Sequence, residues 1–155
     1  MKRLVFDFDG TLYGEGENQR WLELYDLVLS YCPEKIWLFS NGSKWMKLQP
    51  ESPVAFEHIT DIDRRESDLD LVDTCIEFAM SLGYQGSPAN AALVKRAPEG
   101  AYLIDDLAPV WKSIEGSNPE MNLTPEEFLS KIRSNELTLT VDNFGYLAVA
   151  SSYAA

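Results

Sequence analysis

Short apolar runs alternate with segments of helical periodicity along most of the chain. Each apolar run is rich in β-prone residues and ends at small polar or acidic residues, which is typical of a buried strand followed by a tight loop. Between these runs, apolar side chains recur with the period of a helix. The pattern predicts strands at residues 3–8, 36–39, 54–59 and 101–104, and helices at residues 18–31, 44–48, 67–83 and 89–96.

The end of the chain follows a different pattern. Thr124, Pro125 and Glu127 form a helix start, with a capping hydroxyl, a proline at the first helical position and an acidic residue three positions after the cap. Leu137, Leu139 and Val141 alternate with polar residues, an Asp-Asn-Phe-Gly turn follows, and the chain continues as the apolar run 146–149. We therefore expect a final helix and then a β-hairpin that extends or covers the edge of the sheet.

This order of elements indicates the fold class. Strands that alternate with helices are typical of an α/β fold, in which a mostly parallel sheet carries helices on both faces. A length of 155 residues fits one domain, so residues 1–155 are expected to fold as a single unit.

The charge of the chain restricts its partners. The formal net charge is −12, and nucleic acids and anionic membranes are usually bound by clustered basic residues, so both are disfavoured as partners. The same charge opposes a phosphate substrate unless a cation reverses the sign locally. The N-terminus lacks a complete signal-peptide core and no apolar run is long enough to span a bilayer, which predicts a cytoplasmic location.

Polar and acidic residues follow three of the predicted strands. Asp7 and Asp9 end the first, Ser40 follows the second, and Asp105 and Asp106 end the last. Because the C-terminal ends of parallel strands line one crevice, these residues are expected to converge. Four carboxylates in one crevice repel each other and need a cation, and hard oxygen ligands favour Mg²⁺.

Asp7 and Asp9 could have two different chemical roles. Strand alternation would direct Asp7 and Asp9 toward the same reacting centre, so that one can attack while the other transfers protons. A carboxylate nucleophile of this kind splits a difficult displacement into two easier steps. Gly10 and Thr11 suit a turn that aims backbone groups at the site.

These motifs resemble those of a known family. Asp7-Phe8-Asp9-Gly10-Thr11-Leu12 resembles the first motif of the haloacid dehalogenase (HAD) superfamily. Ser40 is similar to the second motif, where a hydroxyl binds the phosphoryl group, and the segment from Tyr102 to Asp106 is similar to the fourth, acidic motif. The resemblance covers residues 3–106 and implies a HAD-like, Rossmann-like three-layer sandwich of the small, capless type.

The resemblance also implies a role for each matching residue. Asp7 would be the nucleophile and a Mg²⁺ ligand, and Asp9 the general acid/base that also offers its backbone carbonyl to the metal. Asp106, with Asp105, would complete the coordination. The substrate-binding residues would be Gly10, Thr11, Ser40, Asn41 and Gly42.

The third motif of the family is less clearly matched. It is a Lys or Arg that neutralises the nucleophile and the phosphate, and it normally opens a helix before the acidic strand. Arg65 or its neighbour Arg64 fits this position best, while Lys95 and Lys44 are the alternatives.

Several residues also have simpler interpretations. An Asp-rich loop after a strand is often an ordinary turn, and Ser40 suits a helix cap about as well as phosphate binding. His58, inside a predicted strand, is expected to be structural, and Trp111 is expected to pack in the core or at an edge.

The sequence thus favours a Mg²⁺-dependent phosphatase that hydrolyses a phosphomonoester through an aspartyl phosphate. The expected substrate is a phosphorylated small molecule or a phosphoprotein. The alternatives are a HAD-like binding or regulatory protein with little or no activity, and a nucleotidase or phosphotransferase. The oligomeric state and the natural substrate stay open.

Overall fold

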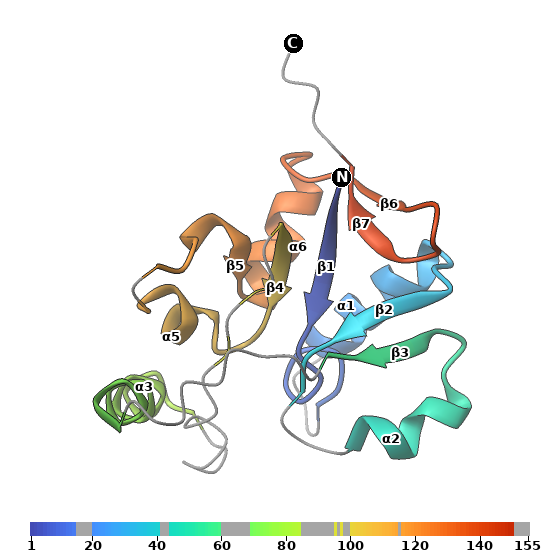
Figure 1. Cartoon of the computed structure of the whole chain (residues 1–155). Coiled ribbons are helices and arrows are strands. Elements are labelled where there is room, and N and C mark those ends of the chain that lie inside the picture. Colours follow the sequence, from blue (N-terminus) through green and yellow to red (C-terminus); the bar gives the residue numbers. More distant parts are fainter. Residues whose placement is uncertain are drawn as a thin grey trace.

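Parallel strands form the centre of the computed structural model (Figure 1). Five strands lie in the order β3-β2-β1-β4-β5, and every neighbouring pair in that order is parallel. Their bounds are β1 Lys2–Phe6, β2 Lys35–Leu38, β3 Ala55–His58, β4 Ala101–Ile104 and β5 Asn122–Leu123. The structure describes residues 1–14, 20–40, 44–59, 69–84, 95, 97, 100–114 and 116–150. The four strands predicted in the first two thirds of the chain are confirmed, whereas β5 was not anticipated.

The C-terminal hairpin makes the sheet mixed. β6 (Leu139–Val141) and β7 (Leu147–Val149) pair antiparallel, as predicted. β7 also pairs antiparallel with Lys2 and Arg3 at the start of β1. The hairpin therefore joins the central strand, contrary to the expectation that it extends or covers the edge of the sheet. The reason is register: β2 meets β1 only from Val5 onward, which leaves the first residues of β1 available to β7. The fold class is therefore α/β with a mixed sheet.

The α-helices of the described residues are α1 Arg20–Ser30, α2 Lys44–Leu48, α3 Leu69–Ser81, α5 Ala108–Lys112 and α6 Pro125–Arg133, and the 3₁₀ turns are η1 Gln49–Glu51 and η2 Pro119–Met121. Helices α1, α2, α3 and α6 lie where the sequence predicts helices, whereas α5 was not anticipated. Thr124 and Glu127 form the predicted capping box of α6. The helix predicted at residues 89–96 lies outside the described residues. Within the described part of the chain, none of the helices combines the length and the apolar character needed to traverse a bilayer.

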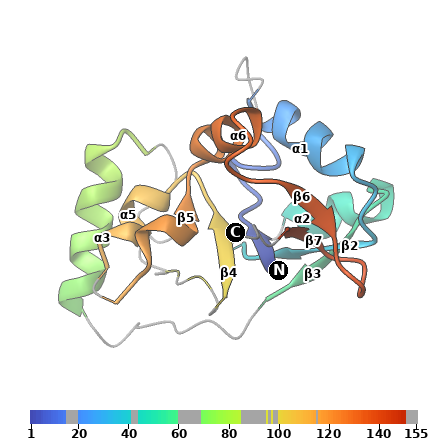
Figure 2. The same cartoon turned by 90° about the horizontal axis from the view of Figure 1, so that it is seen from above.

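The two faces of the sheet carry separate apolar cores. Leu4 and Phe6 of β1 pack with side chains of α1 and α6 on one face. Val5 points the other way and packs with α3 and α5. Figure 2 shows α1 beside α6 and α3 beside α5. Because alternate side chains of β1 pack on opposite faces, β1 lies between two layers of helices.

A charged and aromatic cluster lies at the N-terminal ends of the strands. The Arg3 Nε donates to the Asp142 Oδ2 at 2.9 Å, and the Arg3 side chain is 27% exposed. The guanidinium carbon lies 4.0 Å from the ring centroid of Tyr146 and 4.7 Å from that of Trp37. We refer to Arg3, Trp37, Asp142 and Tyr146 as the Arg3 cluster. It ties the hairpin to β1 and β2.

Candidate functional site

The opposite, C-terminal ends of the strands bring the predicted site residues together. Hydrogen bonds of the sheet continue one residue beyond the strands: the Asp7 N–H donates to the Ile104 carbonyl at 2.9 Å, and the Asp105 N–H donates to the Leu123 carbonyl at 3.0 Å. The Phe39 N–H donates to the Phe6 carbonyl at 2.8 Å, which places Ser40 at the same edge. These residues, distant in sequence, therefore share one end of the sheet, as parallel pairing requires.

Three carboxylates meet at this edge. Asp7, Asp105 and Asp106, here called the acidic cluster, each offer an oxygen, and these oxygens lie within 4.8 Å of one another. Asp7 is 6% exposed and Asp105 is 1% exposed, whereas Asp106 is partly buried. Carboxylates so close together and so poorly solvated require a compensating positive charge.

Lys95 supplies part of that charge. Its Nζ donates to the Asp7 Oδ1 and to the Asp105 Oδ2, both at 2.8 Å, and the residue is buried. Of the basic residues considered for the third motif, Arg64 and Arg65 lie outside the described residues. The Lys44 Nζ lies 5.7 Å from the ring centroid of Tyr13. Lys95, ranked below Arg65 in the sequence interpretation, is thus the described basic residue that contacts the acidic cluster.

Asp105 is held in place by two further donors. The Leu107 N–H donates to its Oδ1 at 2.9 Å, and the Trp111 Nε1 donates to its Oδ2 at 3.1 Å. Trp111 is 1% exposed, so it packs in the core as expected, but the sequence interpretation missed this second role. A buried indole N–H needs an acceptor, and this requirement was the available signal.

Asp9 does not join the acidic cluster. β1 ends at Phe6, and the N–H groups of Thr11, Leu12 and Tyr13 all donate to the Phe8 carbonyl, so the chain coils after Asp7. The two-residue alternation expected for Asp7 and Asp9 therefore stops at the end of the strand. Asp9 is exposed on this turn, and its carboxylate lies outside the group of three.

The turn after β1 nevertheless contacts the site. Gly10 has a φ of +78°, and a Cβ at this position would lie 2.7 Å from the Asp106 Oδ2. Only glycine fits both the backbone conformation and the close approach to the carboxylate. The hydroxyl of the fully buried Thr11 lies 3.5 Å from the Asp7 Oδ2, at the limit of a hydrogen bond.

Ser40 is buried at the end of the neighbouring strand. Its carbonyl accepts a hydrogen bond from the His58 Nε2 at 2.8 Å, and the His58 ring stacks on Trp45 at a centroid distance of 5.1 Å. His58 therefore has a structural contact to the backbone of a predicted phosphate-binding residue. Asn41 and Gly42, the other residues predicted in that loop, lie outside the described residues.

Burial and neighbouring negative charges raise the pKa of two of the three carboxyl groups. Burial, and then the Asp105 charge, raise the pKa of Asp7 from 3.8 to about 7 although Lys95 opposes the shift. Burial, followed by the charges of Asp105 and Asp7, raises the pKa of Asp106 from 3.8 to about 10. Asp106 therefore carries a proton at neutral pH, when no other cation is present.

The remaining pair is stabilised in its charged form. Burial alone would raise the pKa of Asp105, but the Lys95 ammonium outweighs burial and holds this pKa below its ordinary value. Burial likewise opposes the charge of Lys95, but Asp105 and Asp7 raise the pKa of Lys95 well above its ordinary value. The Lys95 ammonium thus pairs with two of the three carboxylates, Asp7 and Asp105. Ionisation of all three carboxylates would leave an excess of negative charge that a divalent cation could balance.

The side chains at this edge of the sheet indicate which ligands the site can bind. The carboxylate oxygens fit a hard cation such as Mg²⁺. The same edge also carries the buried residues Lys95, Thr11 and Ser40. No protein-family model, curated protein or solved structure matches the chain. The chemistry of the site is therefore argued from these residues.

Proposed function

We propose that the chain is a Mg²⁺-dependent phosphohydrolase of the HAD type, with Asp7 as its nucleophile. The observation that carries this proposal is the clustering of Asp7, Asp105 and Asp106 at the C-terminal ends of parallel strands, with the buried Lys95 paired to Asp7 and Asp105. The strand order β3-β2-β1-β4-β5, with helices on both faces, supports the Rossmann-like three-layer arrangement that the resemblance implies.

The acidic cluster would hold the metal. Asp7, Asp105 and Asp106 provide oxygen ligands, and Asp9 would add its backbone carbonyl, as the resemblance implies. Mg²⁺ bound there would supply the positive charge that draws a phosphoryl group into an otherwise acidic protein.

In the first chemical step, an Asp7 carboxylate oxygen forms a bond to phosphorus while the bond from phosphorus to the leaving oxygen breaks. Asp9 gives its proton to that leaving oxygen, which departs as an alcohol. Lys95, bonded to Asp7, favours the ionised carboxylate that the attack requires. In this proposal Lys95 fills the role of the third motif, because it is already within hydrogen-bonding distance of the nucleophile.

The second step regenerates the protein. Asp9, now ionised, takes a proton from water as the water oxygen attacks phosphorus, and the bond between phosphorus and Asp7 breaks to release inorganic phosphate. Asp9 is exposed on the turn after β1, where water has access to it. Ser40 and Thr11 would donate hydroxyl hydrogen bonds to the phosphoryl oxygens.

The test is phosphate release from p-nitrophenyl phosphate and a panel of phosphorylated metabolites and phosphopeptides, with Mg²⁺ and with EDTA. We expect turnover with Mg²⁺ and none with EDTA. Asp7→Asn should reduce turnover by at least about 10³-fold while leaving the fold intact, because no nucleophile remains. Undiminished, metal-dependent turnover by Asp7→Asn would refute the mechanism.

One observation favours a second candidate. Asp9 lies outside the acidic cluster, and a protein of this fold whose acid/base group does not reach the substrate would bind phosphorylated ligands without turning them over. Phosphate binding in the presence of Mg²⁺, with no product from any substrate in the panel, would favour such a binding or regulatory protein. Transfer of phosphate to an acceptor alcohol instead of water would identify a phosphotransferase.

A further inference from the structure

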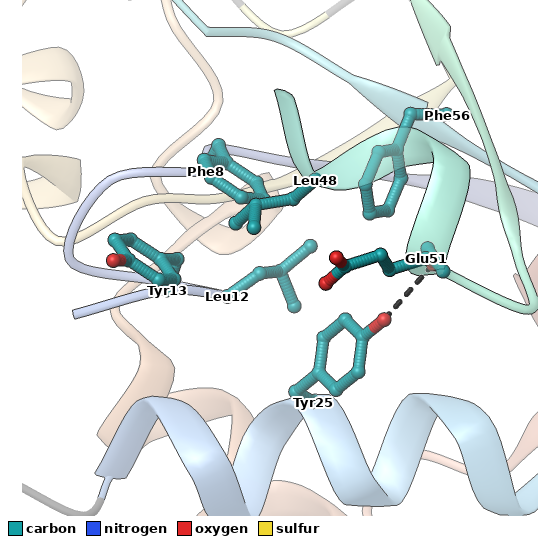
Figure 3. Close-up of a pocket in the computed structure, with 8 residues that line it drawn as sticks. Phe8, Leu12, Tyr13, Tyr25, Leu48, Glu51 and Phe56 are labelled. Atoms are coloured by element: carbon teal, nitrogen blue, oxygen red, sulfur yellow. Dashed lines mark hydrogen bonds between the residues drawn. The ribbon is translucent and has the colours of Figure 1, made fainter. Parts of the chain in front are cut away.

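A pocket of about 250 Å³ lies apart from the acidic cluster (Figure 3). It is bounded by the turn after β1, by α1, and by the segment from α2 through η1 to β3. Its walls include the rings of Phe8, Tyr13, Tyr25 and Phe56. None of the three carboxylates of the acidic cluster lines it, so it is a separate site.

The aromatic walls are fixed by contacts among themselves. Phe8 stacks on Tyr13 with ring centroids 5.6 Å apart and an interplanar angle of 5°, and Phe56 meets Phe8 at 5.8 Å and 65°. The Tyr25 hydroxyl and the Ser52 hydroxyl share a hydrogen bond of 2.9 Å. The rings are therefore held by their neighbours, so the cavity does not depend on a ligand to form it.

A carboxylate lines this aromatic pocket. Glu51 is an exposed residue, and Figure 3 shows its side chain pointing inward toward Leu12. None of the described residues that line the pocket is basic, and no ion pair joins Glu51 to another residue of that part of the chain. A carboxylate and aromatic rings that line one pocket can each interact favourably with a cation.

The composition of the walls distinguishes among cations. A metal ion would need several oxygen ligands, and the pocket offers one carboxylate beside apolar rings. A methylated ammonium matches both features, because its charge interacts with the carboxylate and the rings while its methyl groups fill apolar space. The Lys44 ammonium lies 5.7 Å from the Tyr13 ring centroid, so a bound ammonium group would share this ring with Lys44.

We propose that this pocket binds a small organic cation of the methylated or quaternary ammonium class. Glu51 supplies the negative charge, and Phe8, Tyr13, Tyr25 and Phe56 supply the aromatic walls. This site is independent of phosphate hydrolysis, because binding of the cation requires neither the metal nor Asp7.

The test compares choline with its uncharged carbon analogue, in which a tert-butyl group replaces the trimethylammonium group. Binding to the full chain is followed by calorimetry and by NMR shifts of residues in the pocket. We expect saturable choline binding, at least about tenfold tighter than binding of the analogue. Equal binding of the two compounds, or no saturable choline binding, would overturn the proposal.

Two pairs of variants locate the site. Glu51→Gln should weaken choline binding about threefold to tenfold, whereas Asp26→Asn, which removes one charge from an exposed position on α1 outside the pocket, should not. Tyr25→Leu should weaken binding by a similar factor, whereas Tyr25→Phe keeps the ring and should retain it. Unchanged affinity in Glu51→Gln and Tyr25→Leu proteins with native thermal unfolding would contradict the assignment.

Discussion

The two ends of the central strands hold their charges in opposite ways. At the C-terminal ends, the buried Lys95 faces the three carboxylates of the acidic cluster. At the N-terminal ends, Arg3 has one carboxylate partner, Asp142, and rests against aromatic rings near the surface. The acidic cluster has three carboxylates near one ammonium, whereas the Arg3 guanidinium is paired with the Asp142 carboxylate.

This difference indicates what each end contributes. The Arg3 cluster satisfies its charges within the fold, so it joins the hairpin to the sheet and stabilises it. The acidic cluster raises the pKa of both Asp7 and Asp106, which means that its charged form is unfavourable until a further cation arrives. Such a departure from the most stable arrangement is expected where a protein binds a ligand.

The largest expected difference between the two ends is in pH dependence. Asp7 and Asp106 titrate above their unfolded pKa of 3.8, so the stability they provide is complete below that pH and is lost as the pH rises through about 7 and about 10. Burial opposes ionisation of Asp142, but its hydrogen bond from Arg3 lowers its pKa, so its contribution is lost only as the pH falls below 3.8. Asp105, with its lowered pKa, behaves like Asp142.

Thermal unfolding in EDTA should therefore show a Tm that falls by about 10 °C between about pH 5 and about pH 9. Adding Mg²⁺ should raise the Tm more at about pH 9 than at about pH 5, because the metal and the protons compete for the same carboxylates. A Tm in EDTA that rises across this range would mean that the acidic cluster is not strained by its own charge.

The next largest effect should come from removing the cation at each end. Lys95→Met leaves buried carboxylates without their ammonium and should lower the free energy of unfolding by about 3 kcal/mol at neutral pH. Arg3→Leu removes a partly exposed ion pair and its ring contacts, and should cost about 1–2 kcal/mol. Urea unfolding measures both losses. A larger loss for Arg3→Leu would reverse the comparison between the two ends.

A smaller effect is expected from alanine substitutions at two glycines, one that contacts the acidic cluster and one that does not. Gly10 and Gly83 both have positive φ, of +78° and +81°, but only at Gly10 would a Cβ meet a side chain, that of Asp106. Each alanine variant should lose about 1 kcal/mol of stability. Only Gly10→Ala should also weaken Mg²⁺ binding, which calorimetry would measure. Equal Mg²⁺ affinities in the two variants would show that Gly10 does not shape the acidic cluster.

The sequence predicted the elements of the fold better than their pairing. Apolar periodicity located β1 to β4, and the capping residues Thr124 and Glu127 located α6, because these signals are local. The position of the hairpin next to β1 depends on how far β2 extends along β1, and no local signal carries that information. β5 has only two residues, too few for a periodic pattern.

At the candidate site, too, local sequence signals predicted positions better than tertiary contacts. Asp7, Ser40, Asp105 and Asp106 were placed correctly at one edge, since each lies within two residues of the end of a strand. The direction of the Asp9 side chain was not predictable from strand alternation, because the chain coils immediately after Asp7. Nor does a sequence show which basic side chain reaches the carboxylates, since the reach of Lys95 depends on tertiary packing around its segment.

Magnesium binding by the acidic cluster is the claim on which the account rests, and calorimetric titration of Mg²⁺ tests it most directly. The wild-type chain and Asp26→Asn, an exposed charge change elsewhere, should bind the ion with the same affinity. Asp106→Asn should lose at least about tenfold in affinity, because one of three oxygen ligands becomes neutral. Equal Mg²⁺ affinity in wild type and Asp106→Asn would contradict the account.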